Sequence, residues 1–200
     1  MISGVVGGLH AVMRWSDWLV LLEEQRLPCN LKMLSIQGDA NLEKLLNGLQ
    51  TLTCLKQLEI RGCPKLESFP ERGLPPMLRS LKVIGCENLK WLPHNYNSCA
   101  LEFLDITSCP SLRCFPNCEL PTTLKSIWIE DCRNLESLPE GMMHHNSTCC
   151  LEELKIKGCS RLESFPDTGL PPLLRRLVVS DCKGLKLLPH NYSSCALESL

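Results

Sequence analysis

The sequence is poor in several features that assign a chain to a class at first sight. Only 5% of its 200 residues are aromatic, so aliphatic side chains must build most of any core. Neither sign of charge dominates, because 21 Lys and Arg stand against 22 Asp and Glu, for a net charge of -1. This balance argues against a protein that binds nucleic acid by neutralising its phosphates, and against a polybasic membrane anchor.

Long hydrophobic runs and targeting signals are also missing. Residues 1–13 lack the basic segment and the cleavage site of a secretory signal peptide. The apolar run Trp18–Leu22 is far shorter than the roughly 20 residues that a helix needs to cross a bilayer. We therefore expect a cytoplasmic protein in a reducing compartment, where structural disulfides are rare.

The short motifs of common enzymes are absent as well. The sequence has no G-x-x-x-x-G-K-(S/T), no G-x-S-x-G and no H-E-x-x-H. The nearest approach to a metal-ligand cluster has a spacing that fits no common zinc pattern: Cys114, Cys118, His144, His145, Cys149 and Cys150. We therefore predict no enzyme activity, no catalytic residue, no cofactor and no metal.

What the sequence does contain is an internal repeat of about 23 residues. Most units begin with L-x-x-L-x-(I/V), with Ile in place of the second leucine in the unit at Leu124, and most continue with a cysteine three residues later and then x-x-L-x-x-(L/F)-P. The units start at Leu31, Leu55, Leu78, Leu101, Leu124, Leu151, Leu174 and Leu197, and the last one is truncated. This period and pattern are typical of leucine-rich repeats, which place one short strand in each turn of a solenoid.

The fold prediction follows from the positions within one unit. The fourth and sixth residues point to one face of a strand, and the third, fifth and seventh point to the other. We predict an α/β-type solenoid in the form of a horseshoe or arc, with a parallel β-sheet on the concave face and mostly irregular convex loops. Residues 27–200 form this solenoid, and residues 1–26 form a degenerate segment or a partial cap.

The cysteine count, 14 in 200 residues, is explained in part by the repeat. Six cysteines occupy the ninth position of successive units and are called the cysteine ladder below: Cys63, Cys86, Cys109, Cys132, Cys159 and Cys182. A small thiol at the bend from strand to loop can fill the interior and offer a weak S–H donor to loop backbone. We predict buried, reduced thiols there in preference to disulfides or a metal.

The solvent-facing positions are the candidate site for a protein partner. Phe103 and Trp128 occupy outward slots on adjacent strands, and exposed aromatics flanked by charge mark contact surfaces. The predicted partner-binding residues are Glu59, Arg61, Lys82, Ile84, Phe103, Asp105, Thr107, Trp128, Glu130, Lys155, Lys157, Arg176 and Val178. Alternating charges indicate cross-strand pairs within Glu59–Lys82–Asp105, Glu130–Lys157 and Glu153–Arg176.

The units IRGCPKLESFP, IEDCRNLESLP and IKGCSRLESFP resemble the C-terminal repeats of plant nucleotide-binding leucine-rich-repeat disease-resistance proteins, and best those of the coiled-coil-type branch. The resemblance implies an intracellular immune receptor whose repeats sense a protein and help to hold the receptor's nucleotide switch inactive. That protein is a pathogen effector, a guarded host protein or the nucleotide-binding domain of the receptor itself. Nothing in the sequence resembles a coiled coil or a nucleotide-binding domain, so we expect this chain to be part of a longer receptor.

Two alternatives to the receptor remain open at this point. One is a cysteine-containing leucine-rich-repeat adaptor that presents substrates for ubiquitination, although such repeats usually run longer and lack the closing proline. The other is a truncated gene fragment without a function. Both alternatives keep the solenoid, and neither adds nucleic acid or membrane as a partner.

The first testable prediction concerns the thiols. Because the cysteines follow the repeat, we expect 14 free thiols in the unfolded chain, with the cysteine ladder protected from reagent until the chain unfolds. Thiol titration with and without denaturant measures both numbers. Fewer free thiols in denaturant without reductant would reveal disulfides and contradict the prediction.

Overall fold

The structure is a computed structural model, and it describes residues 2–6, 9–13, 30–45, 48–71, 73–94, 96, 99–116, 120–139, 150–166 and 169–186, the first two ranges by their backbone alone. Trp18–Leu22 and the repeat unit that starts at Leu197 lie outside the described residues.

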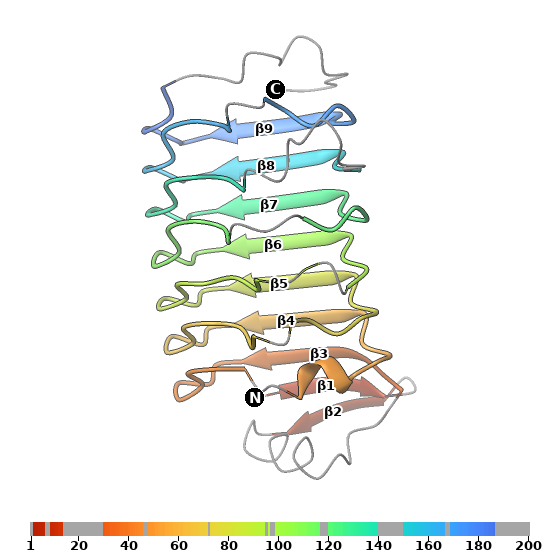
Figure 1. Cartoon of the computed structure of the whole chain (residues 1–200). Coiled ribbons are helices and arrows are strands. Elements are labelled where there is room, and N and C mark those ends of the chain that lie inside the picture. Colours follow the sequence, from red (N-terminus) through yellow and green to blue (C-terminus); the bar gives the residue numbers. More distant parts are fainter. Residues whose placement is uncertain are drawn as a thin grey trace.

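The described chain is a stack of coils, each of which contributes one strand to a single sheet (Figure 1). Seven strands run parallel in chain order: β3 (Leu31–Gln37), β4 (Gln57–Arg61), β5 (Ser80–Ile84), β6 (Phe103–Thr107), β7 (Ser126–Glu130), β8 (Glu153–Lys157) and β9 (Arg176–Ser180). The predicted solenoid with a parallel sheet is confirmed.

The alternation of apolar residues within each unit builds the core. In β4, Leu58 and Ile60 are fully buried, whereas Gln57 and Arg61 at the strand ends are exposed. The register aligns Leu58 with Leu81 and Leu81 with Leu104, so equivalent leucines form a column that runs through the stack. Since strands lie about 4.8 Å apart, each leucine packs against its counterparts in the neighbouring coils.

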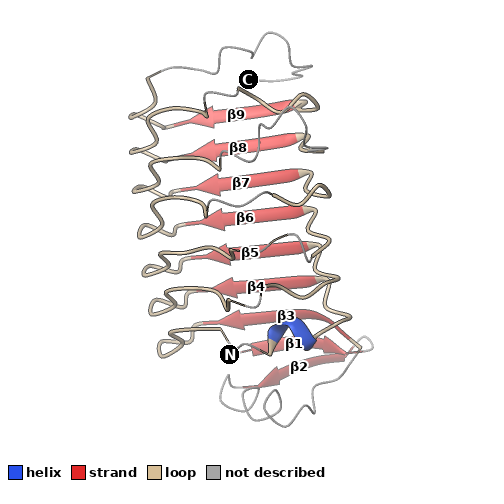
Figure 2. Cartoon of the chain, in the orientation of Figure 1, coloured by secondary structure: helices blue, strands red, loops and turns tan. Residues whose placement is uncertain are grey.

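The return path of each coil is mostly irregular, as expected (Figure 2). Within the described loops the only helical element is η1, a 3-10 helix at Leu49–Thr51. The pattern did not predict one feature of this path, a row of isolated parallel bridges that joins Lys44 to Ser68 and Ser68 to Trp91. These residues hold the fourteenth position of successive units, so the stacking of the strands is repeated on the loop side.

A left-handed residue ends every described parallel strand. Gly62 has φ 58° and donates its N–H to the Ile84 carbonyl oxygen of the next coil at 2.8 Å. Glycine adopts this conformation without strain, and Asp131, with φ 54°, belongs to the few other residue types that tolerate it. In the sequence, this turn is marked by the Gly, Asp or Ser that precedes each ladder cysteine.

The N-terminal segment extends the sheet with an antiparallel hairpin. Strand β1 (Ile2–Val6) pairs antiparallel with β3, and β2 (Leu9–Met13) pairs with β1 at the edge of the sheet. The hairpin satisfies the backbone groups that β3 would otherwise leave unpaired at this edge. The role of residues 1–26 as a partial cap stays a prediction.

The second testable prediction concerns the stacked core. Leu104 is fully buried in the middle of the stack, so Leu104→Ala removes contacts with both neighbouring coils. We expect the free energy of unfolding to fall by about 2–5 kcal/mol, measured by urea denaturation followed by circular dichroism.

A matched pair of valines provides the control. Val83 and Val179 hold the same repeat position, but Val83 is fully buried and Val179, in the last described coil, is only partly buried. The same change to alanine should therefore destabilise the chain more at Val83. Equal losses at the two sites would contradict a stability that rises with burial between two neighbours.

Candidate functional site: the outward face of the sheet

The residues at the third, fifth and seventh repeat positions of β3–β9 form three rows across the sheet, and this surface is called the outward face. The row of fifth repeat positions is in continuous register and consists of Ser35, Glu59, Lys82, Asp105, Trp128, Lys155 and Val178. All of the predicted partner-binding residues lie on this face. They come together because the parallel register brings side chains from successive repeats to neighbouring positions.

An aromatic pair occupies the centre of the outward face, and both side chains are half-buried rather than fully exposed. The Phe103 and Trp128 rings meet edge to face, with centroids 5.0 Å apart and an interplanar angle of 82°. The Lys82 Nζ atom lies 5.5 Å from the Phe103 ring centroid, and the Lys155 Nζ atom lies 5.2 Å from that of Trp128. Ring quadrupoles attract such cations, and this attraction holds two ammonium groups beside an apolar centre.

A buried polar group lies beside the aromatic pair. Asp105 is 8% exposed although it belongs to an outward row, and its Oδ1 atom accepts a hydrogen bond of 2.8 Å from the Thr107 hydroxyl. The neighbouring Trp128 Nε1 atom is buried and has no acceptor in the described coils. An unsatisfied buried donor costs about 1–3 kcal/mol.

The ion pairs of the outward face differ in part from the expected cross-strand pairs. Arg176 Nη1 lies 3.0 Å from Glu153 Oε1, as the alternation predicted. Glu130, however, pairs with Lys155 at 2.7 Å and not with Lys157.

The expected chain of charges across β4, β5 and β6 does not form among the described residues. Glu59 pairs with Arg61 of its own strand. Asp105 is bound by Thr107, and the Lys82 ammonium lies over the Phe103 ring. The physical reason is that each side chain can also contact residues two positions away on its own strand, or an aromatic ring, and these contacts form here in place of the cross-strand ion pairs.

The other predicted partner-binding residues differ in exposure. Arg61, Lys157 and Arg176 are exposed, whereas Ile84 and Val178 are half-buried. Ser35 also holds a position that the repeat pattern assigns to the solvent, but it is only 4% exposed and accepts a hydrogen bond from Gln37.

The cysteine ladder lies behind the outward face, at the bend that follows each strand. All six thiols are free. Five of them are buried, but Cys182 is half-buried, so the protection until unfolding that the sequence led us to expect for the whole ladder applies to those five and not to Cys182. The Cys109 thiol lies 3.5 Å from the Thr107 carbonyl oxygen and 3.7 Å from that of Val83 in the preceding coil. A thiol in this slot can therefore donate within its own coil or to the coil before it.

Burial and neighbouring thiols change the acidity along the ladder. Burial raises the pKa of Cys132 to about 12. The Cys159 thiol hydrogen-bonds to Cys182 and lowers the pKa of Cys182 to about 7, against the opposing effect of burial. The thiol at the half-buried end of the described ladder is thus the more acidic one.

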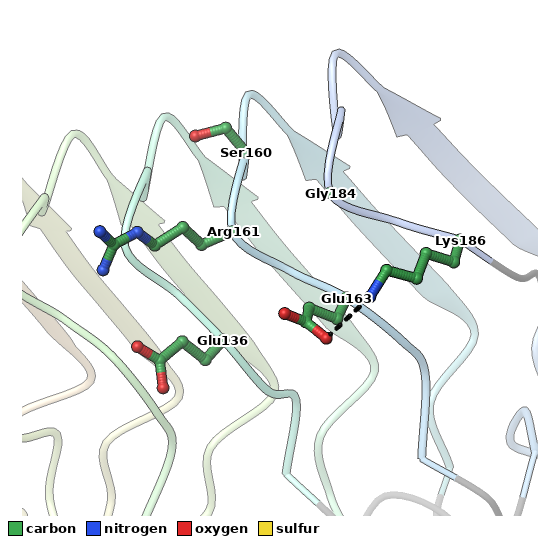
Figure 3. A pocket seen from close by; sticks show the side chains of 6 residues that line it. All are labelled: Glu136, Ser160, Arg161, Glu163, Gly184 and Lys186. Atoms are coloured by element: carbon green, nitrogen blue, oxygen red, sulfur yellow. Dashed lines mark hydrogen bonds and ion pairs between the residues drawn. The ribbon is translucent and has the colours of Figure 1, made fainter.

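Two surface features lie on the loop side of the coils. A shallow hollow of about 400 Å³ is lined by Glu136, Ser160, Arg161, Glu163, Gly184 and Lys186, and Lys186 pairs across it with Glu163 at 3.2 Å (Figure 3). Gly184 must lack a side chain, because a Cβ there would lie 2.5 Å from the Ser160 carbonyl oxygen. The second feature is Trp91, which is 48% exposed.

The described residues hold no group of three or more His, Cys, Asp or Glu side chains that could bind a metal ion. Of the sequence cluster considered above, only Cys114 and Cys150 belong to the described residues. No helix in the described part of the chain is long and apolar enough to cross a membrane.

The stack of coils, the parallel sheet and the repeating consensus define a leucine-rich-repeat domain. A solved structure, the leucine-rich-repeat domain of the type III effector XopL, is similar with a TM-score of 0.57 and 22% identity, over 92% of this chain and 72% of that one. At that identity the likeness shows the fold.

The sequence is homologous over its repeats to disease resistance proteins of Arabidopsis thaliana. It is 34% identical to disease resistance protein RPP4 over 85 residues and 35% identical to disease resistance protein RPS6 over 66 residues. These matches cover 42% and 33% of this chain but 7% and 6% of the relatives, so the chain spans a small fraction of their length. No family model matches. The relatives' descriptions name no branch, so the coiled-coil-type assignment stays a prediction.

The third testable prediction concerns thiol reactivity. Because the thiolate is the reacting species, Cys182, whose pKa is about 7, should be alkylated by iodoacetamide at neutral pH far faster than Cys132, whose pKa is about 12. Mass spectrometry of peptides from the folded chain measures the order.

Removing the hydrogen-bond donor gives a sharper control. Cys159→Ala takes away the S–H donor that stabilises the Cys182 thiolate, so alkylation of Cys182 at neutral pH should slow while Cys54, an exposed cysteine far from the pair, keeps its rate. An unchanged Cys182 rate in this variant would contradict the proposed cause.

Proposed function

We propose that this chain is a protein-interaction module that binds a partner protein on its outward face and performs no catalysis. The observation that carries the proposal is the Phe103–Trp128 pair. Two aromatic rings stand in outward slots at the middle of the sheet, in contact with each other and with two lysine ammonium groups. Aromatic anchors at the centre of a surface with a charged rim are the usual source of binding energy in protein interfaces.

The wider role is that of the recognition domain of a plant disease-resistance receptor. The homology to disease resistance proteins over the repeats supports this role. The partner is then a pathogen effector, a guarded host protein or the nucleotide-binding domain of the receptor that contains these repeats. The compartment is the cytoplasm, in keeping with the free cysteines of the described coils.

The fourth testable prediction removes the aromatic centre. Proteins captured from plant leaf extract by the wild-type chain are identified, purified and titrated against Phe103→Ala and Trp128→Ala by calorimetry. Each substitution should weaken binding by about 2 kcal/mol or more, which is roughly thirtyfold, because it truncates an anchor at the centre of the interface.

The matched control is Lys125→Ala together with Arg175→Ala, two exposed residues at the second repeat position and outside the outward face. These variants should bind like the wild type. Circular dichroism verifies that all variants are folded. A folded Phe103→Ala, Trp128→Ala double variant that retains full affinity would refute the proposed site.

A further inference from the structure

The charges of the outward face are unequally satisfied. Its four carboxylates are all engaged within the protein: Glu59 with Arg61, Asp105 with Thr107, Glu130 with Lys155 and Glu153 with Arg176. Of its five cations, Lys82 and Lys157 have no carboxylate partner among the described residues. The Thr107 hydroxyl does not neutralise Asp105, but this carboxylate is only 8% exposed. The charges without an ion-pair partner that the face offers to a partner are therefore those of the two lysines, although the whole chain carries a net charge of -1.

The two unpaired lysines flank the aromatic pair. Lys82 lies on β5 and its ammonium is above the Phe103 ring, whereas Lys157 lies on β8, beyond Trp128 on β7. The two lysines are three strand steps apart across the sheet, or roughly 14 Å at about 4.8 Å a step, and two residues apart along the strands, so their Cα atoms are separated by roughly 16 Å. A cation, an apolar centre and a second cation thus follow one another along the face.

We propose that the occupant of the outward face is an extended acidic segment of a partner protein, with two carboxylates that bracket an apolar side chain. The inference rests on the proposed function and specifies the partner's chemistry. An extended chain advances about 3.3 Å per residue, so carboxylates four or five residues apart span the two lysines. The apolar side chain between them covers the Phe103 and Trp128 rings.

A protein segment fits this face better than a polyanion does. Nucleic acids and sulfated sugars bind through many cations, because each neutralised phosphate or sulfate releases counterions. Here three of the five cations are already neutralised by neighbours, and the remaining pair is separated by apolar rings. Two isolated charges around an apolar centre match a short segment with two defined carboxylates.

Selection from a random dodecapeptide display library tests the proposal. The library is panned in parallel on the wild-type chain, on Lys82→Glu/Lys157→Glu, and on the control Lys56→Glu/Lys125→Glu. The control makes the same change of charge at exposed lysines of the second repeat position. The best wild-type peptide is then titrated against all three folded proteins at low and high salt.

We expect the wild type and the control to enrich the same peptides, with two acidic residues four or five positions apart around an apolar one. The reversed variant should enrich basic residues at those two positions. It should bind the wild-type peptide at least about tenfold more weakly, with the difference shrinking as salt screens the charges. Selected peptides without acidic residues, peptides indifferent to the reversal, or no enrichment at all would overturn the proposal. So would heparin binding that depends on both lysines when no acidic peptide is enriched.

The same panel separates this inference from the proposed function. If peptides are selected that require Phe103 and Trp128 but ignore the charge reversal, the outward face is a binding site and only the acidic chemistry is wrong. If the selected peptides and the captured plant proteins bind the aromatic double variant as well as the wild type, the proposed site itself fails.

Discussion

A coil of about 23 residues encloses too little apolar volume to bury its own leucines. Each coil buries them by packing against the two neighbouring coils, and the rest of this structure depends on that packing. Leu58, Leu81 and Leu104 become a continuous column because the parallel register places equivalent residues side by side. The same stacking sets the bridges between loops and the left-handed turn after each strand. It also places the ladder thiols where they meet carbonyl oxygens of their own coil and of the coil before.

Stacking also explains where a binding surface can arise. The inward side chains of the strands are buried in the core, and the loops differ in length from coil to coil. The outward side chains, in contrast, are held in a regular array by the backbone hydrogen bonds of the sheet. Phe103 and Trp128 lie on adjacent strands of that array, so their rings meet without help from a loop. A rigid scaffold of this kind presents anchors at little cost in conformational entropy, which favours recognition of another protein.

The thiols show how one residue type can serve different purposes in one fold. In the interior, Cys132 behaves as a small apolar side chain whose ionisation is suppressed by burial. At the half-buried Cys182, the hydrogen bond from Cys159 outweighs burial and favours the thiolate. An abundance of cysteine that would suggest disulfides in a secreted protein therefore reflects a repeated packing solution, in which acidity varies with position along the stack.

The sequence by itself determined the solenoid, the parallel strands, the inward leucines and the membership of the outward rows, because a period of about 23 residues with apolar residues at the fourth and sixth positions leaves one way to bury them. Only the tertiary structure decided which neighbours interact within those rows. It paired Glu130 with Lys155, placed Lys82 over Phe103 and buried Asp105 beside Trp128. The period aligns residues from successive coils but leaves each side chain a choice between partners along the strand and across it, and that choice depends on distances and burial that exist only once the coils are stacked.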